Sequence, residues 1–600
     1  MSPLPTRSIA RRLVSRLALA AAGLTLAAPA VAQEASPYAR VVVFGDSISD
    51  GGAYADRAPA GAGSFTTNPD PVWVESIAAG LGLGLKPPAA GGTNFAEGGA
   101  RVATPRPGAP GDLSRTPVVN QIDAYLAGGG VFRPDDLVII QGGGNDVFAT
   151  QINGLDFTAA DLAVLDRAAR DLAGQVRRIA AAGEATIVTV SVPRFEAFNQ
   201  YYRPALAAAG TNVLYVDIAR LIREIEITPG AFGVANVTDR ACRGRAVESF
   251  TCLPADYVTP DANRTYLFAD GVHFTGVVHR IEADAVLAAL RASNQVGQLP
   301  LAAQAALQSS QDALAPFVRA NSAPVGTWAV FGWAEGSRLD IDAGARASGL
   351  EADATGATVG AIYSPRTGLR VGGALSWSDT DGDFGGGTGG FGLRAATLSA
   401  FGRIEAGRFD ALVQAAYGDL AFDDVTRRVV LGPAERIEAG DTHGRMWSVG
   451  AEAGVSAAAG PLAVRPLVRL RYERVEVGAY AEAGGRSTQA TFGDQAVESL
   501  LASFGAEIAW ADAAIARPFL RLSYDTDLLD DRPTISLTPG GAPVPFTTET
   551  FRPDDSYFTY AAGVTADLRP GVSATTQVVG TFGRGAVDAV GVRIGVRGQF

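Results

Sequence analysis

After Gly326 the chain changes to a repeat of two residues, and this pattern constrains the fold more than any other feature. About twelve segments of roughly ten or more residues carry small or apolar side chains at alternate positions, with loops rich in glycine, aspartate and arginine between them. In the last segment one face holds Val592, Ile594, Val596 and Phe600, and the other holds Arg593, Arg597 and Gln599. The pattern predicts a transmembrane antiparallel β-barrel with an apolar outside and a polar lumen. A soluble all-β domain is the alternative, and the even count, the segment length and the terminal aromatic favour the barrel.

The region between Ala39 and about Ser293 is organised differently. Short, continuously apolar runs alternate with helical patterns, as expected for strands buried on both faces of a parallel sheet. The strand-like runs are 40–44, 136–141, 185–190 and 213–218, and the helical patterns include 158–183 and 278–293. This alternation predicts a three-layer α/β domain.

Residues 1–32 have the features of an export signal. A basic segment without acidic residues precedes an apolar, alanine-rich stretch, and Ala30-Val31-Ala32 fits the signal peptidase rule. We therefore expect cleavage before Gln33. A single transmembrane anchor is the alternative, but the apolar run is short and contains Pro29. The Arg11-Arg12 pair matches twin-arginine export only weakly, so the export route stays open.

Charge and cysteine content narrow the range of partners. The formal net charge is -12, with 62 acidic and 50 basic residues. This balance argues against nucleic acid, which requires a basic face. The two cysteines, Cys242 and Cys252, lie close together in a polar stretch, and in an exported chain they predict one disulfide. No histidine lies near them, so we expect no zinc site there, and no metal or organic cofactor is implied elsewhere.

Chemically suggestive motifs follow the strand-like runs. Ser47 in VVVFGDS and Asn145 in IIQGGGNDVF each come one step after such a run. Ligands bind at the carboxyl ends of strands in open α/β sheets, so we expect these two residues to meet. The stretch TNFAEGGA at 93–100 lies between them, and LFADGVHFT places Asp270 three residues before His273.

This combination resembles the GDSL, or SGNH, family of lipases and esterases over about residues 39–293. The resemblance implies a flavodoxin-like three-layer fold and assigns five roles to residues of this chain. They are the nucleophile Ser47, the oxyanion glycine Gly99 (or Gly98, if the register differs by one), the oxyanion asparagine Asn145, the acid Asp270 and the base His273.

The region after Gly326 resembles the translocator of bacterial autotransporters. That resemblance implies a twelve-stranded barrel with a helix in its pore, and the helix-prone stretch 299–320 is the candidate. It also implies an outer membrane of a Gram-negative bacterium, with lipid around the barrel, insertion by the barrel-assembly machinery and display of the first domain on the cell surface. The expected parts are a signal peptide (1–32), a hydrolase passenger (33–295), a linker with pore helix (296–324) and the barrel (325–600).

The implied chemistry is that of a serine esterase acting on an acyl ester or lipid. Ser47 needs a base, His273 would take its proton, and Asp270 would orient the imidazole. The oxyanion would be met by the backbone N–H groups of Ser47 and Gly99 and by the amide of Asn145.

Several of these residues have structural alternatives. Asn145 could cap the following helix, Asp146 is expected to be a cap or a structural hydrogen-bonding residue, and Asp46 is expected to form the turn. Asp50 could be an N-cap, and the pair Tyr201-Tyr202 could line an acyl groove or simply pack. The other two histidines, His279 and His443, lack the neighbourhood of His273.

Three functions remain open at this stage. The leading one is a surface-displayed carboxylesterase or lipase. An acyltransferase or phospholipase would use the same triad with a different acceptor or substrate. A non-enzymatic adhesin is disfavoured, because a binding module has no need of an intact serine, histidine and aspartate together.

Overall fold

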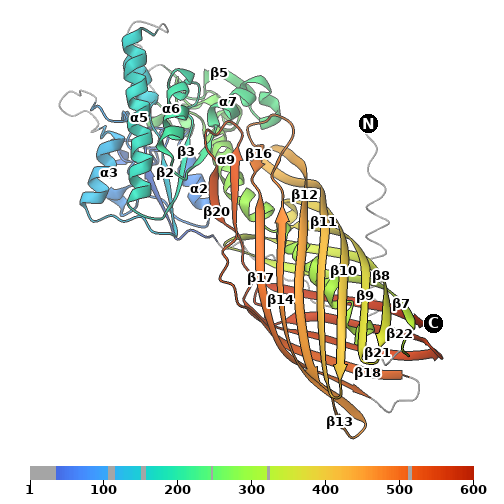
Figure 1. Cartoon of the computed structure of the whole chain (residues 1–600). Coiled ribbons are helices and arrows are strands. Elements are labelled where there is room, and N and C mark those ends of the chain that lie inside the picture. Colours follow the sequence, from blue (N-terminus) through green and yellow to red (C-terminus); the bar gives the residue numbers. More distant parts are fainter. Residues whose placement is uncertain (1–35, 106–114, 151–156, 245–247, 320–323, 511–515) are drawn as a thin grey trace.

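The computed structural model of the chain describes residues 36–105, 115–150, 157–244, 248–319, 324–510 and 516–600. An α/β domain lies at one end of a long β-barrel (Figure 1). The expected signal peptide, residues 1–32, lies outside the described residues. No helix within those ranges is both long enough and apolar enough to cross a membrane.

The α/β domain is built on four parallel strands in the order β1-β2-β3-β4. They are β1 (Arg40–Phe44), β2 (Asp136–Ile140), β3 (Thr186–Val190) and β4 (Leu214–Val216). All four strands are where the sequence predicts them. The fourth is shorter than the apolar run 213–218 because Asp217 caps the next helix, accepting a hydrogen bond from the backbone N–H of Arg220 at 3.1 Å.

Helices cover both faces of this sheet, which gives the predicted three layers. Alternate residues of β1 point to opposite faces: Val41 and Val43 join one apolar core, and Val42 and Phe44 join the other. The first core includes α2 (Trp73–Gly80), α7 (Ile218–Ile227) and α9 (Gly276–Val296), and the second includes α3 (Val118–Ala127), α5 (Ala159–Ala181) and α6 (Glu196–Ala209). The shorter elements are α4 (Gly144–Thr150), α8 (Ala262–Thr265), β5 (Asn236–Arg240) and β6 (Tyr266–Phe268).

The second domain is a closed antiparallel barrel of twelve long strands. Neighbouring strands pair in sequence, and the pairing of β12 with β14 and of β7 with β23 completes the ring. The twelve are β7 (Trp328–Gly344), β8 (Ala347–Arg366), β9 (Leu369–Phe384), β10 (Gly389–Ala406), β11 (Phe409–Leu431), β12 (Ala434–Val455), β14 (Leu462–Val477), β17 (Gln495–Trp510), β18 (Ala516–Asp527), β21 (Ser556–Arg569), β22 (Val572–Phe582) and β23 (Val587–Gln599). Short strands accompany them: β13 (Ala457–Ala459), β15 (Tyr480–Ala481), β16 (Ala490–Phe492), β19 (Thr534–Pro539) and β20 (Phe546–Glu549).

The distribution of side chains on the barrel is the reverse of that in a soluble protein. Ile594 is 61% exposed on the outside of β23, whereas Arg593 and Arg597 of the same strand are 5% and 8% exposed in the lumen. Leu375 on β9, Leu398 on β10 and Val413 on β11 are exposed in the same way. This is the apolar exterior and polar interior that the two-residue repeat predicts.

Several strands are longer than a membrane requires. β11 has 23 residues and β12 has 22, whereas a tilted strand needs only about 9–11 residues to cross the hydrocarbon core. The extra length reaches the α/β domain, since the turn at Gly432 between these two strands meets Ile281 and Asp284 of α9. The alternating pattern underestimates these strands because their far ends pack against the passenger and no longer face lipid.

Two helices fill part of the lumen. The stretch predicted as the pore helix forms α10 (Leu299–Asp312) and α11 (Ala315–Arg319), with Pro316 in the first turn of the second helix. Residue 320, the last of the predicted range, lies outside the described residues.

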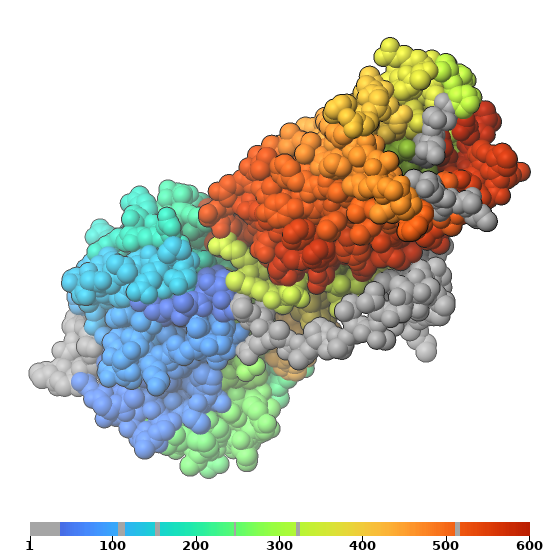
Figure 2. Space-filling model, turned by 90° about the horizontal axis from the view of Figure 1, so that it is seen from below, coloured from blue at the N-terminus to red at the C-terminus, as the bar shows by residue number. Residues whose placement is uncertain are grey.

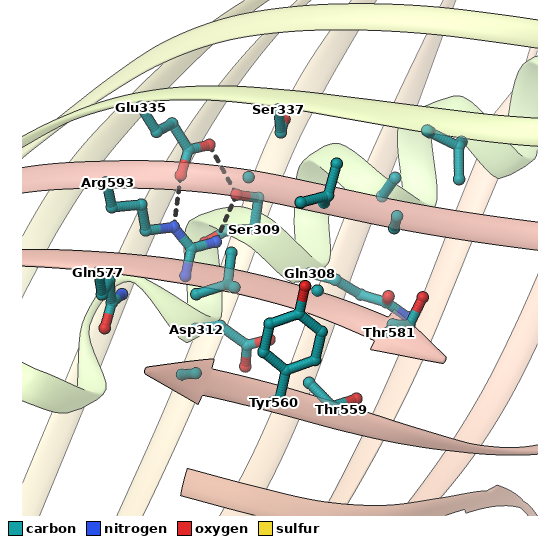
Figure 3. A pocket seen from close by; sticks show the side chains of 18 of the residues that line it. Gln308, Ser309, Asp312, Glu335, Ser337, Thr559, Tyr560, Gln577, Thr581 and Arg593 are labelled. Atoms are coloured by element: carbon teal, nitrogen blue, oxygen red, sulfur yellow. Dashed lines mark hydrogen bonds and ion pairs between the residues drawn. The ribbon is translucent and has the colours of Figure 1, made fainter. Parts of the chain in front are cut away.

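Charged groups fix these helices to the wall. Figure 3 shows Arg593 donating to Glu335 at 2.7 Å and to Ser309 of α10 at 2.7 Å. Ser309 in turn donates to Glu335 at 2.6 Å. On another side Asp312 accepts from Arg469 at 2.7 Å.

The α/β domain rests directly on the barrel end that is remote from Phe600 (Figures 1 and 2). Glu224 of α7 accepts hydrogen bonds from Arg436 at 2.7 Å and from the backbone N–H of Ser487 at 2.7 Å. Asn212 and Thr547 exchange two hydrogen bonds of 2.8 Å. One apolar core runs across the junction and includes residues of both domains. The two domains therefore form a continuous packed structure.

We predict that Leu398→Arg destabilises the barrel. Leu398 lies midway along β10 and is 62% exposed on the outer face, so an arginine there would be placed in lipid at a cost of about 2–4 kcal/mol. Urea unfolding of the chain in lipid vesicles, followed by tryptophan fluorescence, measures the change. Leu398→Phe is the matched control and should unfold like the wild type. Equal stability of the arginine variant would mean that this face does not contact lipid.

Candidate active site

Ser47 lies in the turn that follows β1. The side chain of Gln121 holds Gly45 on both sides, accepting from its N–H and donating to its carbonyl, each at 2.9 Å. Asp46 forms the turn as expected, because its carboxylate and carbonyl oxygens accept from the backbone N–H groups of the two residues after Ser47. The serine is 7% exposed at the carboxyl end of the sheet.

His273 reaches Ser47 from a loop 226 positions later in the chain. Its Nε2 lies 2.8 Å from Ser47 Oγ, and its Nδ1 lies 2.8 Å from Asp270 Oδ2. The loop begins after β6 and ends at α9, and the N–H of Ala269 donates to the carbonyl of His273 at 2.8 Å. A serine, an imidazole and a carboxylate in this order can transfer a proton away from the hydroxyl as it attacks.

Asp270 is held as a carboxylate. Its Oδ1 accepts from the backbone N–H groups of Val272 and His273 at 2.8 Å, and its Oδ2 also accepts from the N–H of Ser249 at 2.9 Å. Burial raises the pKa of Asp270, but the charge of His273 and these hydrogen bonds outweigh burial and hold the pKa well below its usual range. An ionised Asp270 keeps the Nδ1 proton of His273 in place.

Asp46 carries a second buried carboxyl group near the imidazole. Burial raises the pKa of Asp46 to about 6, and the backbone N–H of Ile48, the side chain of Gln141 and the charge of His273 oppose that rise. The carboxyl of Asp46 accepts from the backbone N–H of Ile48 at 3.2 Å and interacts with His273 through charge.

The backbone around Gly99 offers hydrogen-bond donors for an oxyanion. Gly99 has a φ of +78°, a left-handed conformation that favours glycine. The N–H of Gly98 is already bonded to Asp50 Oδ2 at 2.8 Å. Within the described residues the N–H groups of Ser47 and Gly99 make no hydrogen bond, so both are available. This difference favours Gly99 over Gly98.

Asn145 contributes a side-chain amide at the start of α4. Its Nδ2 donates to the carbonyl of Ala100 at 3.0 Å, which leaves its second N–H for a ligand. The amide therefore acts as a donor to the loop beside Gly99 and does not act as a helix cap. Asp146 is a structural hydrogen-bonding residue: it accepts from the N–H of Val102 at 2.9 Å and from Arg101 at 3.1 Å.

One pair of aromatic rings contacts His273, and another includes a ring on α4, the helix that contains Asn145. Phe65 lies 5.1 Å from the ring of His273 and stacks on Phe250, with ring centroids 5.6 Å apart. Phe148, 38% exposed on α4, meets Phe195 edge to face at 5.1 Å. Sequence reasoning does not find Phe65, because its only signal is an aromatic residue in a glycine-rich loop.

Cys242 and Cys252 are bonded to each other, and the segment they enclose supports the acid. It contains Ser249, whose N–H donates to Asp270. Asn68 holds the same segment from outside, donating from its side chain to the carbonyl of Ser249 at 2.9 Å and from its N–H to the carbonyl of Cys252 at 3.1 Å. The cysteine loop thus borders the site, a connection that the sequence does not reveal.

The other singled-out residues lie outside this arrangement. Tyr202 is fully buried in the second core and shares a 2.7 Å hydrogen bond with Thr189, and Tyr201 packs against the same core. His279 is fully buried and accepts from the N–H of Trp73 at 3.3 Å, and His443 is part of β12. Among the described residues no group of three or more His, Cys, Asp or Glu side chains could hold a metal ion.

Two protein-family models match the chain, one in each domain. A model described as GDSL-like Lipase/Acylhydrolase matches residues 41–286, and a model described as Autotransporter beta-domain matches residues 330–578. The chain is a GDSL-type serine ester hydrolase joined to an autotransporter β-domain, and that domain assigns it to the outer membrane.

Two bacterial esterases agree with this assignment. Esterase EstA of Pseudomonas aeruginosa is 28% identical over 596 aligned positions, which cover 90% of this chain and 92% of the esterase. Esterase EstA of Pseudomonas putida matches with the same values. The translocator domain of autotransporter NalP from Neisseria meningitidis is 16% identical over 50% of this chain and 97% of that structure, with a TM-score of 0.42. The barrel assignment rests on the family model and the strand pairing, and not on this likeness.

We predict that Cys242→Ala with Cys252→Ala destabilises the passenger and leaves the barrel intact. A disulfide that spans ten residues contributes about 2–3 kcal/mol. The denaturant midpoint of esterase activity of the full chain should fall, while the heat-dependent gel shift of the barrel stays unchanged. The wild type treated with a reductant is the matched comparison and should behave alike. An unchanged midpoint would show that the cysteine loop does not stabilise the site.

Proposed function

We propose that the passenger hydrolyses acyl esters outside the cell, with Ser47 as nucleophile, His273 as base and Asp270 as the orienting acid. The observation that carries the proposal is the pair of 2.8 Å contacts that links Ser47 Oγ, His273 and Asp270. The roles assigned by the resemblance to the GDSL family fall on the same three residues. The rest of the proposal follows from what each group can do in this arrangement.

In the first half of the reaction, Ser47 Oγ attacks the ester carbonyl while His273 Nε2 takes its proton. Asp270 fixes the imidazole with its Nδ1 protonated, so that Nε2 is the nitrogen that accepts. The same proton then passes to the leaving alcohol. The carbon–oxygen bond of the ester breaks, and the acyl group remains on Ser47.

The negative charge on the former carbonyl oxygen is met by three donors. They are the N–H groups of Ser47 and Gly99 and the free N–H of Asn145. Each donor of this kind contributes roughly 3–4 kcal/mol, or about 100- to 1,000-fold in rate. Fixed donors are effective because they need no rearrangement as the charge develops.

In the second half, a water molecule attacks the acyl-enzyme and gives a proton to His273. The bond between the acyl carbon and Ser47 Oγ then breaks, His273 returns the proton to Ser47 Oγ, and the acid product leaves. An acyltransferase would differ only in using another alcohol at this step. Hydrolysis is preferred because two relatives that each cover 90% of the chain are named esterases. The apolar rings of Phe65 and Phe148 favour substrates with an apolar acyl chain, and a phospholipid remains a second candidate substrate.

Display on the cell surface is the second part of the proposal. The passenger is continuous with the barrel through α9 and α10 and lies beyond the end remote from Phe600. Insertion by the barrel-assembly machinery would place that end outside the cell. An adhesin on this scaffold is disfavoured, because it gives no reason for the proton-transfer chain at Ser47.

Intact cells that carry the full chain provide the test. We expect them to hydrolyse p-nitrophenyl butyrate, and we expect Ser47→Ala to reduce this rate by about 1,000-fold or more, because the nucleophile is lost. Equal amounts of folded barrel in both strains, seen by the gel shift, are the control. Equal hydrolysis by the two strains would overturn the hydrolase proposal. Activity only after lysis would overturn the display.

Asp270→Asn is predicted to lower kcat by about 1,000- to 10,000-fold with little change in KM. An amide nitrogen facing His273 Nδ1 favours the tautomer whose Nε2 carries the proton, and that nitrogen cannot accept the proton of Ser47. Initial rates of purified protein measure both constants, and a preserved circular dichroism spectrum shows that the fold survives. Wild-type kcat in this variant would remove Asp270 from the mechanism.

A further inference from the structure

The loop that carries Gly99 is attached to the nucleophile turn at several points. The N–H of Phe95 donates to the carbonyl of Val43 at 2.8 Å, and the N–H of Glu97 donates to the carbonyl of Gly45 at 3.1 Å. The loop therefore continues the sheet edge beside β1. These contacts fix its first half, but they do not determine the direction of the peptides at Gly98 and Gly99.

The carboxylate of Asp50 fixes that second half. Asp50 is fully buried three residues after Ser47. Its Oδ2 accepts from the N–H of Gly98 at 2.8 Å, and its Oδ1 accepts from the N–H groups of Gly52 at 2.9 Å and Ala53 at 2.6 Å. The bonds to Gly52 and Ala53 have the pattern of the N-cap that the sequence suggests, but the next helix spans Ala55–Arg57 and has Tyr54 at its N-cap, so Asp50 caps a turn. It joins the turn that follows the nucleophile to the glycine that precedes Gly99.

We propose that Asp50 is a positioning residue of the oxyanion hole, which holds the Gly98 N–H so that the next N–H, that of Gly99, stays free for the substrate oxygen. The inference rests on the proposed function and adds a residue to it. Asp50 touches neither the substrate nor the reacting atoms. It acts through the loop 97–100.

The hydrogen bond to Gly98 is strongest when Asp50 is ionised, because a carboxylate accepts backbone N–H groups more strongly than a neutral acid does. Burial raises the pKa of Asp50 to about 7, although the three N–H groups oppose the rise. Two negative side chains act on it: Glu97 in the loop and Glu75 on α2, and the pKa of Glu75 is itself raised to about 7 by burial. Below about pH 7, Asp50 becomes protonated and its hydrogen bond with the N–H of Gly98 weakens.

Asp50→Asn tests the inference directly. The amide keeps an acceptor for Gly52 and Ala53 but turns an N–H group toward the N–H of Gly98. We expect kcat for p-nitrophenyl butyrate to fall about 10- to 100-fold with KM within about twofold. Inhibition by an alkyl trifluoromethyl ketone should weaken by the same factor, because its adduct with Ser47 also places a negative oxygen in the hole.

Asp136→Asn is the matched control. Asp136 is equally buried, but it lies at the opposite end of β2, where it pairs with Arg40. Its replacement should lower the unfolding midpoint without changing kcat or the ketone affinity. Wild-type kcat and ketone affinity in Asp50→Asn would overturn the inference and leave the proposed function standing. If the wild type itself does not hydrolyse p-nitrophenyl butyrate, the proposed function is overturned instead.

Glu75→Gln gives a second test if Asp50→Asn fails to fold. Removing the negative charge of Glu75 lowers the pKa of Asp50, so the acid limb of kcat/KM should move to lower pH by about 0.5 unit. The rate on the alkaline plateau should be unchanged, because Glu75 does not contact Ser47 or His273. An acid limb at the wild-type position would contradict the requirement for an ionised Asp50.

Discussion

Every backbone N–H and C=O in a lipid environment must find its partner within the protein, and the pairing of the first long strand, β7, with the last, β23, meets this requirement by closing the barrel. Closure fixes the rest of the architecture. It forces one side of each strand toward lipid and the other toward a narrow lumen, where arginines such as Arg593 need acidic partners. Ser309 and Asp312 on α10 accept hydrogen bonds from such arginines. The helix in the lumen therefore provides some of the polar and acidic partners that the barrel wall requires. The same helix continues the last helix of the hydrolase domain with only a short break.

The active site also depends on contacts between segments that lie far apart in the sequence. Ser47 follows the first strand of the sheet, whereas His273 and Asp270 lie just before α9, the helix that leads into the barrel. Their meeting requires the complete sheet and the loop between β6 and α9. Around them, other residues hold the groups of the site in place: Ser249 holds Asp270, Ala100 holds Asn145, and Asp50 holds Gly98, the residue before the donor Gly99. Chemistry at one serine thus draws on segments from most of the α/β domain.

The sequence predicts those features that leave a periodic or local signal. The apolar run 40–44 and the GDS that follows give both a strand and a candidate nucleophile, and the two-residue repeat gives the barrel. Features that arise from packing leave no such signal. Phe65 contacts His273 only because the glycine-rich loop folds over it, and Ser249 reaches Asp270 only because the cysteine loop lies beside β6. The alternating pattern also does not predict the full length of β11, because the far end of this strand packs against the passenger and does not face lipid. The sequence suggests Asp50 as an N-cap, but its bond to Gly98 depends on a loop 48 positions away.

The connection between the two domains has a consequence for the fate of the enzyme. Residues 295–304, which lead from α9 into α10, are all buried. A protease needs an accessible, extended segment, and the junction offers neither an exposed nor an extended one. Shedding would therefore require the passenger to be pulled away from the barrel first. A catalyst tied down in this way is divided between daughter cells when the envelope divides, and it releases its products beside the cell that made it.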